Sequence, residues 1–431
     1  MVSRPSSPST ILPPSPAADR SPSVRLSVIV VYVAALLQGA LGITFVSSST
    51  FLRERLSMGD TLYGAAFIPL YGLAIVSSLA AARMHARFNL RAFFLWGSCS
   101  CAVMLALIAI SPSLGAPGGS LLVLIAMTIS GPGLGVFGIA LNTAVIEIFP
   151  ATRATALAYL HALLAAGTAI WPLVVAISIR RGLWPAALLA LAAAILGLAL
   201  LVRLRPLPGL SIAQAPAAQG SPAIPSLAPR RALRLWLWAG TVLIYGICEA
   251  VFTAWAVIFL TESRSLSLTA AAGALSVFWI AMTAGRLLAA VLVRRLGTLP
   301  IALSLCAGMG LAFLLLPHCA GTADALARFA LAGFSCSALF PLLLGLASHE
   351  FPERTPQVSA LFAAMVMGGL TIGSFAPGPL RAVLGLERIY TFAALAPLLL
   401  ALALLALGRA QLRMAAARML KRSPWRRPGR P

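Results

Sequence analysis

Twelve apolar stretches, each long enough to cross a lipid bilayer, constrain this chain more than any other feature of its sequence. A membrane-spanning helix needs about 20 mostly apolar residues. A soluble domain carries about 25% charged residues, whereas this chain of 431 residues is 60% hydrophobic and 10% charged. The pattern predicts an all-α integral membrane protein with about twelve transmembrane helices. The expected spans are 25–48, 61–82, 92–111, 120–148, 155–178, 184–202, 235–260, 268–292, 299–317, 325–348, 357–380 and 389–408.

The segment between the sixth and seventh spans has a different composition. Residues 203–234 are rich in Pro, Ala, Ser and Gly, which is typical of a flexible linker. They separate an N-terminal six-helix half, residues 25–202, from a C-terminal six-helix half, residues 235–408. We expect residues 1–24, which are rich in Pro and Ser, to form a disordered tail, and residues 409–431 to form a basic cytoplasmic tail.

The two halves also resemble each other in sequence. A shift of 208 residues places Phe51-Leu52 on Phe259-Leu260, and Phe149-Pro150 is repeated 202 residues later. Such duplicated six-helix units are typical of many secondary transporters. Further matches at the first offset are Glu54 with Glu262, Ser57 with Ser265, Thr61 with Thr269, Tyr71 with Trp279 and Arg87 with Arg295.

Positive charge is divided unevenly between the two ends of the predicted spans. If both termini lie in the cytoplasm, 23 Lys and Arg residues fall on the cytoplasmic side and 8 on the other side. Short cytoplasmic loops of membrane proteins carry an excess of Lys and Arg, so we expect this orientation in a multi-pass protein of a bacterial inner membrane. The same loops and tails explain the net charge of +22, so we do not expect nucleic acid as a partner.

The seventh span contains a single acid, Glu249, near its middle. An ionised carboxylate at the centre of a bilayer costs about 3 kcal/mol, and such residues usually serve a function. Tyr245, Phe252 and Ala256 share the helical face of Glu249. We expect this face to line a transport pathway, with Tyr245 and Glu249 binding the solute or coupling protons. The alternative is a protonated Glu249 that only joins two helices by a hydrogen bond.

Polar and aromatic side chains in other spans extend this candidate site. The amides of Gln38 and Asn142 can bind a sugar hydroxyl, or equally bridge two helices. His161 can titrate near neutral pH and act in a proton relay, or pack as a neutral side chain. Tyr71 and Trp279 occupy equivalent places in the repeat, so they are candidates for stacking on a sugar ring, and packing is the alternative.

Basic loops after the second and eighth spans, together with two six-helix halves, resemble the major facilitator superfamily. The loop motif of that family reads approximately G-x-L-A-D-R-x-G-R-R. The sequence GRLLAAVLVRRLG at 285–297 is similar to it, with Arg286 leading and Arg295 in register. Arg294 replaces the Asp of the motif, which leaves the charge latch of the family without its acid. The resemblance implies a gating role for Arg286 and Arg295.

The equivalent loop of the first half, AARMHARFNLR at 81–91, keeps Arg87 of the motif and has Ala86 in place of the Asp. Arg87 is therefore a gating candidate by the same resemblance, and a simple topology signal is the alternative. Glu147 precedes Phe149-Pro150 near the expected cytoplasmic end of the fourth span. We interpret it as a gate or helix-capping residue that pairs with Arg153.

Two longer stretches, 141–173 and 245–286, are similar to the fucose-permease-like branch of the superfamily, whose members are mostly proton-linked sugar carriers. The fifth span lacks a clear antiporter signature, because only Gly167, Thr168 and Pro172 match it, and they match it weakly. The resemblance therefore favours a sugar carrier over a drug exporter.

The sequence contains no P-loop, zinc motif, nucleophile triad or Gly-rich dinucleotide loop, and its six cysteines lack metal-ligand spacing. We therefore expect no enzyme activity, no cofactor and no metal. The main hypothesis is a monomeric secondary transporter that moves a small solute, coupled to protons, by alternating access. The alternatives are a drug or metabolite exporter that exchanges protons, and a non-transporting receptor or scaffold that works through the basic tail 409–430.

Overall fold

The computed structural model of the chain describes residues 22–84, 88–205, 207–210 and 228–422. Within this part of the chain the secondary structure is helical, without a β-strand. It contains twelve segments that are long and apolar enough to cross a membrane. The predicted all-α fold with twelve spans is confirmed.

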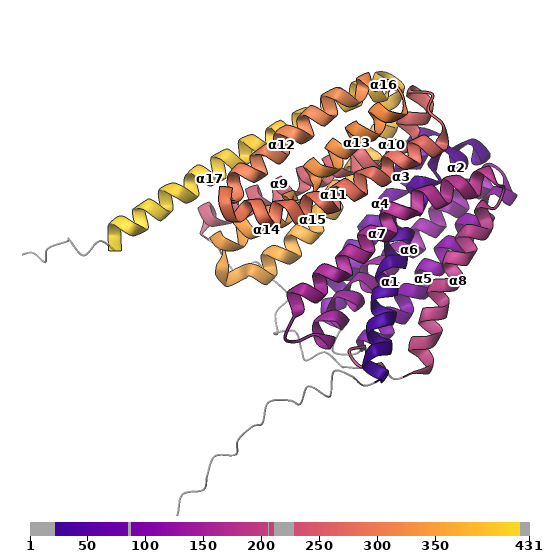
Figure 1. Cartoon of the computed structure of the whole chain (residues 1–431), viewed down its shortest axis with the longest axis horizontal. Helices are drawn as coiled ribbons and strands as arrows, with labels where there is room; N and C mark the ends of the chain where they lie inside the picture. The colour runs from indigo at the N-terminus through magenta and orange to yellow at the C-terminus, as the bar shows by residue number, and fades with distance from the viewer. Residues whose placement is uncertain (1–21, 85–87, 206, 211–227, 423–431) are drawn as a thin grey trace, which may run out of the picture.

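The first six spans form one bundle, coloured from indigo to magenta in Figure 1. Helices α3 and α4 together make the second span. The helices are α1 (Pro22–Ser47), α2 (Ser49–Leu56), α3 (Asp60–Ala65), α4 (Phe67–Met84), α5 (Leu90–Ile110), η2 (Ser111–Leu114), α6 (Gly118–Ile148), α7 (Arg153–Arg180) and α8 (Trp184–Leu204).

The last six spans form a second bundle, coloured from pink to yellow. Its tenth and twelfth spans are each built from two helices. The helices are α9 (Pro229–Ala254), α10 (Ala256–Ile258), η3 (Phe259–Ser263), α11 (Leu268–Leu296), α12 (Thr298–Leu315), η4 (Leu316–His318), α13 (Thr322–Cys336), α14 (Leu339–Glu350), η5 (Pro352–Arg354), α15 (Thr355–Phe375), α16 (Pro377–Ala393) and α17 (Leu395–Arg422).

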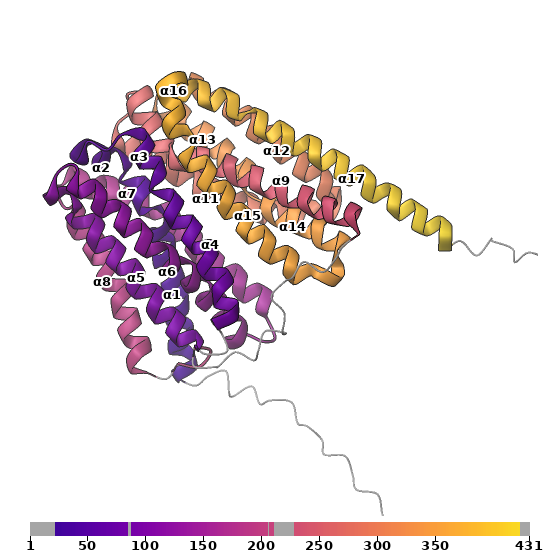
Figure 2. The same ribbon diagram turned by 180° about the vertical axis from the view of Figure 1, so that it is seen from behind.

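The two bundles meet at one end and diverge toward the other, which gives the molecule the outline of a V (Figures 1 and 2). The end where they meet contains α2, α3, α10 and α16, and we call it the far end. The opposite end, where α1 and α9 begin and α8 ends, is the termini end. Helix α7 packs against α11, α4 against α15, and α3 against α16, and smaller contacts join α3 to α15 and α2 to α10.

Within the first bundle, glycines allow α1 and α7 to approach closely. A Cβ added to Gly39 would lie 1.9 Å from the carbonyl oxygen of Leu164, and one added to Gly167 would lie 1.9 Å from that of Leu36. No other residue fits at these two points, because Cβ atoms do not approach other heavy atoms so closely. Small residues provide this kind of contact in membrane helix packing generally.

The second bundle repeats the same contact between α9 and α15. A Cβ on Gly246 would lie 2.5 Å from the carbonyl oxygen of Val366, and one on Gly369 would lie 2.2 Å from that of Leu243. The glycines and their partners correspond one to one with those of the first bundle, at an offset of 207 residues for α9 and 202 for α15. The packing therefore confirms the internal repeat predicted from the sequence.

Several helix boundaries differ from the predicted spans. The eleventh span was expected to reach residue 380, but α15 ends at Phe375 and α16 begins with Pro377. Proline lacks the N–H that would continue the first helix, and it fits well in the first turn of the next. Helices also extend into the segments predicted as linker and tails: α1 begins at Pro22, α8 ends at Leu204, α9 begins at Pro229 and α17 continues to Arg422. Residues 1–21, 211–227 and 423–431 of those segments lie outside the described residues.

Candidate functional site

A cavity of about 210 Å³ lies between the two bundles, with Glu249 of α9 in its wall. Its lining comes from α1, α4, α6 and α7 of the first bundle and from α9, α11 and α15 of the second. Gln38, Tyr71 and Trp279 also line it. The structure thus brings together four of the residues that the sequence singled out as solute or proton sites.

The cavity combines aromatic rings with a few polar groups. Its rings are Phe67, Tyr71 and Trp279, and Phe67 stacks on Tyr71 with 6.1 Å between the ring centroids. The hydroxyls of Thr168 and Thr253, which also line it, donate hydrogen bonds to backbone carbonyls of their own helices at 2.9 and 2.8 Å. The other polar side chains in the lining are those of Gln38, Glu249, Tyr71, Trp279 and Ser374.

Glu249 is surrounded by other titratable groups. Tyr245 is buried on α9, one turn nearer the termini end than Glu249. Its hydroxyl hydrogen-bonds the Glu249 carboxyl. Tyr71 from the first bundle, Arg286 from α11 and Cys336 from α13 act on it electrostatically. Tyr245 thus supports the acid rather than lining the cavity itself.

The internal repeat gives Glu249 an unexpected counterpart. The offset of 207 residues that relates α1 to α9 places Gly42 at the position of Glu249 and Gln38 at that of Tyr245. Gly42 lines the same cavity, and a Cβ added to it would meet no other atom within 4 Å. One bundle therefore contributes the acid, and the other contributes open space at the matching position.

Tyr71 and Trp279 are equivalent in the structure as well as in the sequence. A Cβ on Gly131 of α6 would lie 2.8 Å from the carbonyl oxygen of the residue before Tyr71. One on Gly333 of α13 would lie 2.0 Å from that of the residue before Trp279. The two rings therefore enter the cavity from matching helices on opposite sides.

Asn142 and His161 do not line this cavity. The Asn142 amide nitrogen donates to the carbonyl oxygen of Gly138 on its own helix at 2.8 Å, so this bond neither reaches the cavity nor bridges two helices. His161 is exposed on α7 and lies seven residues before Thr168, about 10 Å closer to the termini end. Arg286 acts on it electrostatically, so it faces the second bundle rather than a solute bound beside Glu249.

The predicted gating residues do not form one cluster among the described residues. Arg295 is exposed near the end of α11, and Arg87 lies outside the described residues. Glu147 and Arg153 are both exposed and do not form the expected ion pair with each other in this structure. Arg286 is exposed in the second half of α11, and its Nε donates to the carbonyl oxygen of Ser337 at 2.8 Å.

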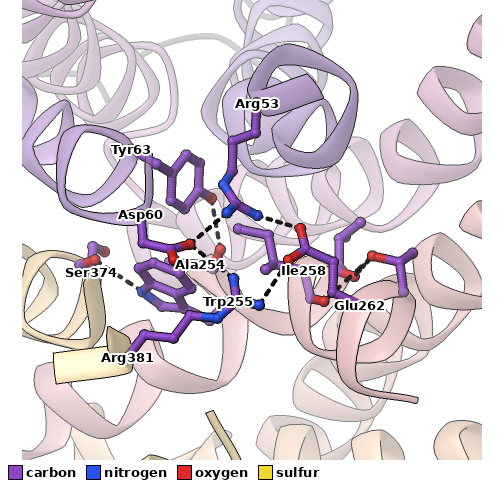
Figure 3. Close-up of polar contacts among 11 residues, drawn as sticks. Arg53, Asp60, Tyr63, Ala254, Trp255, Ile258, Glu262, Ser374 and Arg381 are labelled. Carbon is purple, nitrogen blue, oxygen red and sulfur yellow. Dashed lines mark hydrogen bonds and ion pairs between the residues drawn. The ribbon is translucent and has the colours of Figure 1, made fainter. Parts of the chain in front are cut away.

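Four charged residues that sequence reasoning did not select join the two bundles at the far end (Figure 3). Arg53 binds Asp60 of its own bundle at 2.6 Å and also pairs with Glu262 of the other bundle. Arg381 from the second bundle binds Asp60 at 2.8 Å and Glu262 at 2.7 Å. Each bundle supplies one arginine and one acid, so positive and negative groups alternate around the cluster.

Backbone contacts close the far end further. The Tyr63 hydroxyl of α3 donates to the carbonyl oxygen of Ala254 at 2.7 Å, at the break between α9 and α10 (Figure 3). The ring of Tyr63 packs edge-on against Trp255 with 5.2 Å between the ring centroids. A Cβ on Gly378 would lie 2.6 Å from the carbonyl oxygen of Asp60, so α16 and α3 touch through their backbones.

The missed cluster had only a weak signal in the sequence. All four charges lie in or beside the short connections at the far end, where Arg53 and Arg381 belong to the minority of arginines on that side. Nothing local in the sequence pairs Arg53 with Glu262, or Arg381 with Asp60. The alternation of charges becomes visible only when the two bundles are placed together.

Comparisons with known proteins agree with this architecture. The sequence profile of the Major Facilitator Superfamily matches residues 28–374, and no curated protein matches the chain. A mutant of the nucleoside transporter NupG is similar in structure, with 15% identity over 89% of this chain and 99% of that chain, at a TM-score of 0.75. A bacterial homolog of the human lysosomal transporter Spinster, in an inward-facing and occupied conformation, is 13% identical over 90% of this chain and 97% of that chain, with a TM-score of 0.69. The transporter FucP, in its outward conformation, is 15% identical over 89% of this chain and 99% of that chain, with a TM-score of 0.60.

Proposed function

The chain belongs to the major facilitator superfamily, and from this premise we propose that it is a secondary active transporter that moves a small polar solute by alternating access. The observation that carries the proposal is the cavity between the two bundles, which is lined by residues of both and contains the acid Glu249. Binding sites at the repeat interface near the bilayer midplane are common among secondary transporters.

Alternating access requires the far end to open while the termini end closes. In the described state the far end is joined by the ion pairs of Arg53 with Glu262 and of Arg381 with Asp60. If the termini are cytoplasmic, this state faces inward. We propose that these ion pairs break, and that the bundles rock about the contacts of α7 with α11 and α4 with α15, when the carrier turns outward.

Glu249 is the residue through which we propose that proton movement is coupled to the solute. It lies in the wall of the cavity, and Tyr71, Tyr245, Arg286 and Cys336 are the titratable or charged groups that face it. A carboxyl in this position changes the charge of the cavity when it gains or loses a proton. Solute affinity therefore depends on its protonation state, which is the requirement for symport.

For the solute class, the cavity supports a sugar or a related small polar molecule. Tyr71 and Trp279 offer two rings that can stack on a ring-shaped solute, and Gln38 and Glu249 offer hydrogen-bonding groups. The similarity in fold to a nucleoside transporter extends the class to be screened to nucleosides.

The proposed mechanism needs only one chain and no cofactor. Residues from both bundles of a single chain complete the cavity, so a monomer has a whole site. Its expected setting is the inner membrane of a bacterium, with both termini in the cytoplasm. In this proposal the protein transports a solute and does not catalyse a chemical reaction.

The test is uptake into proteoliposomes that contain the full chain. Monosaccharides, their uronic acids and nucleosides are offered with a proton gradient, to the wild type, Glu249→Gln and the control Glu54→Gln. Glu54 is exposed at the far end, so its variant makes the same chemical change away from the cavity. We expect Glu249→Gln to exchange solute across the membrane but to lose accumulation, while Glu54→Gln accumulates it normally. Normal accumulation by Glu249→Gln would show that Glu249 is only structural.

A further inference from the structure

Arg286 is a cation within a membrane-spanning helix, and its side chain is exposed there. The ion pairs formed among the described residues do not include it. Its two hydrogen bonds run to the carbonyl oxygen of Ser337 at 2.8 Å and to the sulfur of Met282 at 3.3 Å. Neither partner carries a charge. Unpaired arginines are costly at membrane depth, and they usually mark a substrate or ion pathway.

The bond to Ser337 has a local cause in the tenth span. Pro341 has no N–H, so the carbonyl four residues earlier, that of Ser337, lacks its usual donor within the helix. The span is interrupted here, since α13 ends at Cys336 and α14 begins at Leu339. The Nε of Arg286 takes the place of the missing donor. This bond holds the guanidinium in one orientation and leaves most of its N–H groups for another partner.

Arg286 does not line the transport cavity itself and lies on its termini side. Trp279, which lines the cavity, lies seven residues earlier on α11, two turns away on the same face. Arg286 acts electrostatically on Glu249 and Tyr245 of α9, on Cys336 of α13 and on His161 of α7. The groups on which it acts therefore belong to both bundles. The hydroxyl of Ser337 at the same helix break is buried without a partner among the described residues.

We propose that the transported solute carries a carboxylate and that Arg286 binds it, an inference that rests on the proposed transport function. A guanidinium presents parallel N–H groups that match the two oxygens of a carboxylate. The uncharged part of the solute lies against Tyr71, Trp279 and Gln38. The chemical class is a small organic monoanion with a polar or ring-shaped body, such as a sugar acid.

This assignment gives Glu249 a defined role in coupling. A deprotonated Glu249 would repel a carboxylate bound in the same cavity, so the anion binds together with a proton on Glu249. The groups facing Glu249 are Tyr71, Tyr245, Arg286 and Cys336, and His161 faces Arg286. One proton and one carboxylate then cross together, and the step moves no net charge. If a neutral solute crossed with a proton, one positive charge would move, and the accumulation ratio at equilibrium would change about fifty-fold per 100 mV.

The experiment compares matched solutes in proteoliposomes of the full chain. D-glucuronate and D-galacturonate are tested against D-glucose and D-galactose, which carry a hydroxymethyl group in place of the carboxylate. A pH gradient and a potassium–valinomycin potential are applied separately. We expect uptake of the uronates, driven by the pH gradient and unchanged by the potential. Arg286→Gln should lower uronate uptake about 100-fold, and Arg286→Lys should retain part of it.

Arg294→Gln is the control, because Arg294 is exposed on the same helix and should leave uptake unchanged. A folding defect in Arg286→Gln is recognised by size-exclusion chromatography, and the voltage test on the wild type does not depend on any variant. Three results would overturn the carboxylate proposal: uptake of the neutral hexoses alone, uronate uptake that depends on voltage, or uronate uptake retained by Arg286→Gln. Each of them would still be consistent with the proposed transport function. Absence of uptake of every compound, including the nucleosides and monosaccharides named above, contradicts both proposals.

Discussion

Gly42 of α1 and Glu249 of α9 occupy equivalent positions in the two bundles, and both line the cavity between them. The duplicated scaffold is therefore symmetric in its helix contacts and asymmetric in its chemistry. A single acid on one side avoids the repulsion of two buried carboxylates. The open space at Gly42 leaves room beside that acid for a solute.

The first prediction concerns this space. Gly42→Leu should place its side chain in the cavity of about 210 Å³ and compete with the solute, because a Cβ at Gly42 meets no atom within 4 Å. We expect KM for uptake to rise at least about tenfold, which corresponds to 1.4 kcal/mol, while the folded protein is retained. Gly240→Leu on α9 is the control, since a Cβ there also meets open space but the residue does not line the cavity. Equal KM values for the two variants would remove Gly42 from the binding site.

The second prediction concerns the ion pairs at the far end. Arg53→Glu removes the pairs with Asp60 and Glu262 and puts three acids together, so the outward-facing population should rise. Partly exposed pairs contribute up to about 1 kcal/mol each, so we expect a shift of roughly five- to thirty-fold. The readout is labelling of a cysteine placed at Ser374, which is buried in the cavity wall near the far end, by an impermeant reagent added only on the far side, in a cysteine-free background.

The charge-swap variant Arg53→Glu with Glu262→Arg is the matching control. It restores one opposite-charge pair between the bundles and should return labelling toward the level of the wild type. If the single and double variants label equally, the ion pairs do not contribute to closure of the far end.

The third prediction concerns the backbone contact between α3 and α16. Gly378→Val should prevent closure, because a Cβ would lie 2.6 Å from the carbonyl oxygen of Asp60 and neither backbone can yield without separating the helices. We expect strong labelling at Ser374 and loss of net uptake, with solute binding from the far side preserved. Gly345→Val is the control, since a Cβ at Gly345 meets nothing within 4 Å. Wild-type labelling in Gly378→Val would mean that the helices do not need this contact to close.

The fourth prediction uses the symmetry of the two rings in the cavity. Tyr71→Ala and Trp279→Ala should each raise KM about three- to ten-fold, because an aromatic contact contributes roughly 0.5–1.5 kcal/mol. Similar effects in both are expected, since the rings enter from equivalent helices. Trp236→Ala removes an exposed ring at the termini end and should leave KM unchanged. An effect in only one of the two cavity variants would indicate that the solute contacts one bundle alone.

The fifth prediction concerns stability of the second bundle. Glu350 accepts two hydrogen bonds from Arg234, one of them 2.8 Å long, and another from the Trp238 indole at 2.9 Å. Glu350→Ala leaves the Arg234 charge without this acid, a change that typically costs about 3–5 kcal/mol. We expect a clear fall in Tm in detergent. Glu353→Ala, which loses only an exposed pair with Arg231 at 2.7 Å, should melt like the wild type.

Part of the site was predictable because a bilayer makes single residues conspicuous. Glu249 and Gln38 stand out as polar side chains in otherwise apolar spans, and insertion cost is a property of one residue and its depth. The equivalence of Tyr71 and Trp279 followed from aligning the halves. The same local reasoning could not separate Gln38, which lines the cavity, from Asn142, which bonds its own helix. That difference depends on how the helix is rotated against its neighbours.

The sequence by itself determined the class of fold, the number of spans and their arrangement in two similar halves. These features follow from the length and apolarity of each stretch and from the repetition of residues at a fixed offset, which are local properties. Only the tertiary structure decided which charges meet. Asp60 and Arg381 are separated by 321 residues and Arg53 and Glu262 by 209, and they pair because the two bundles meet at the far end. Likewise Arg286 matches a loop motif in the sequence, but only the fold shows that its Nε bonds the carbonyl oxygen of Ser337 at the break in the tenth span.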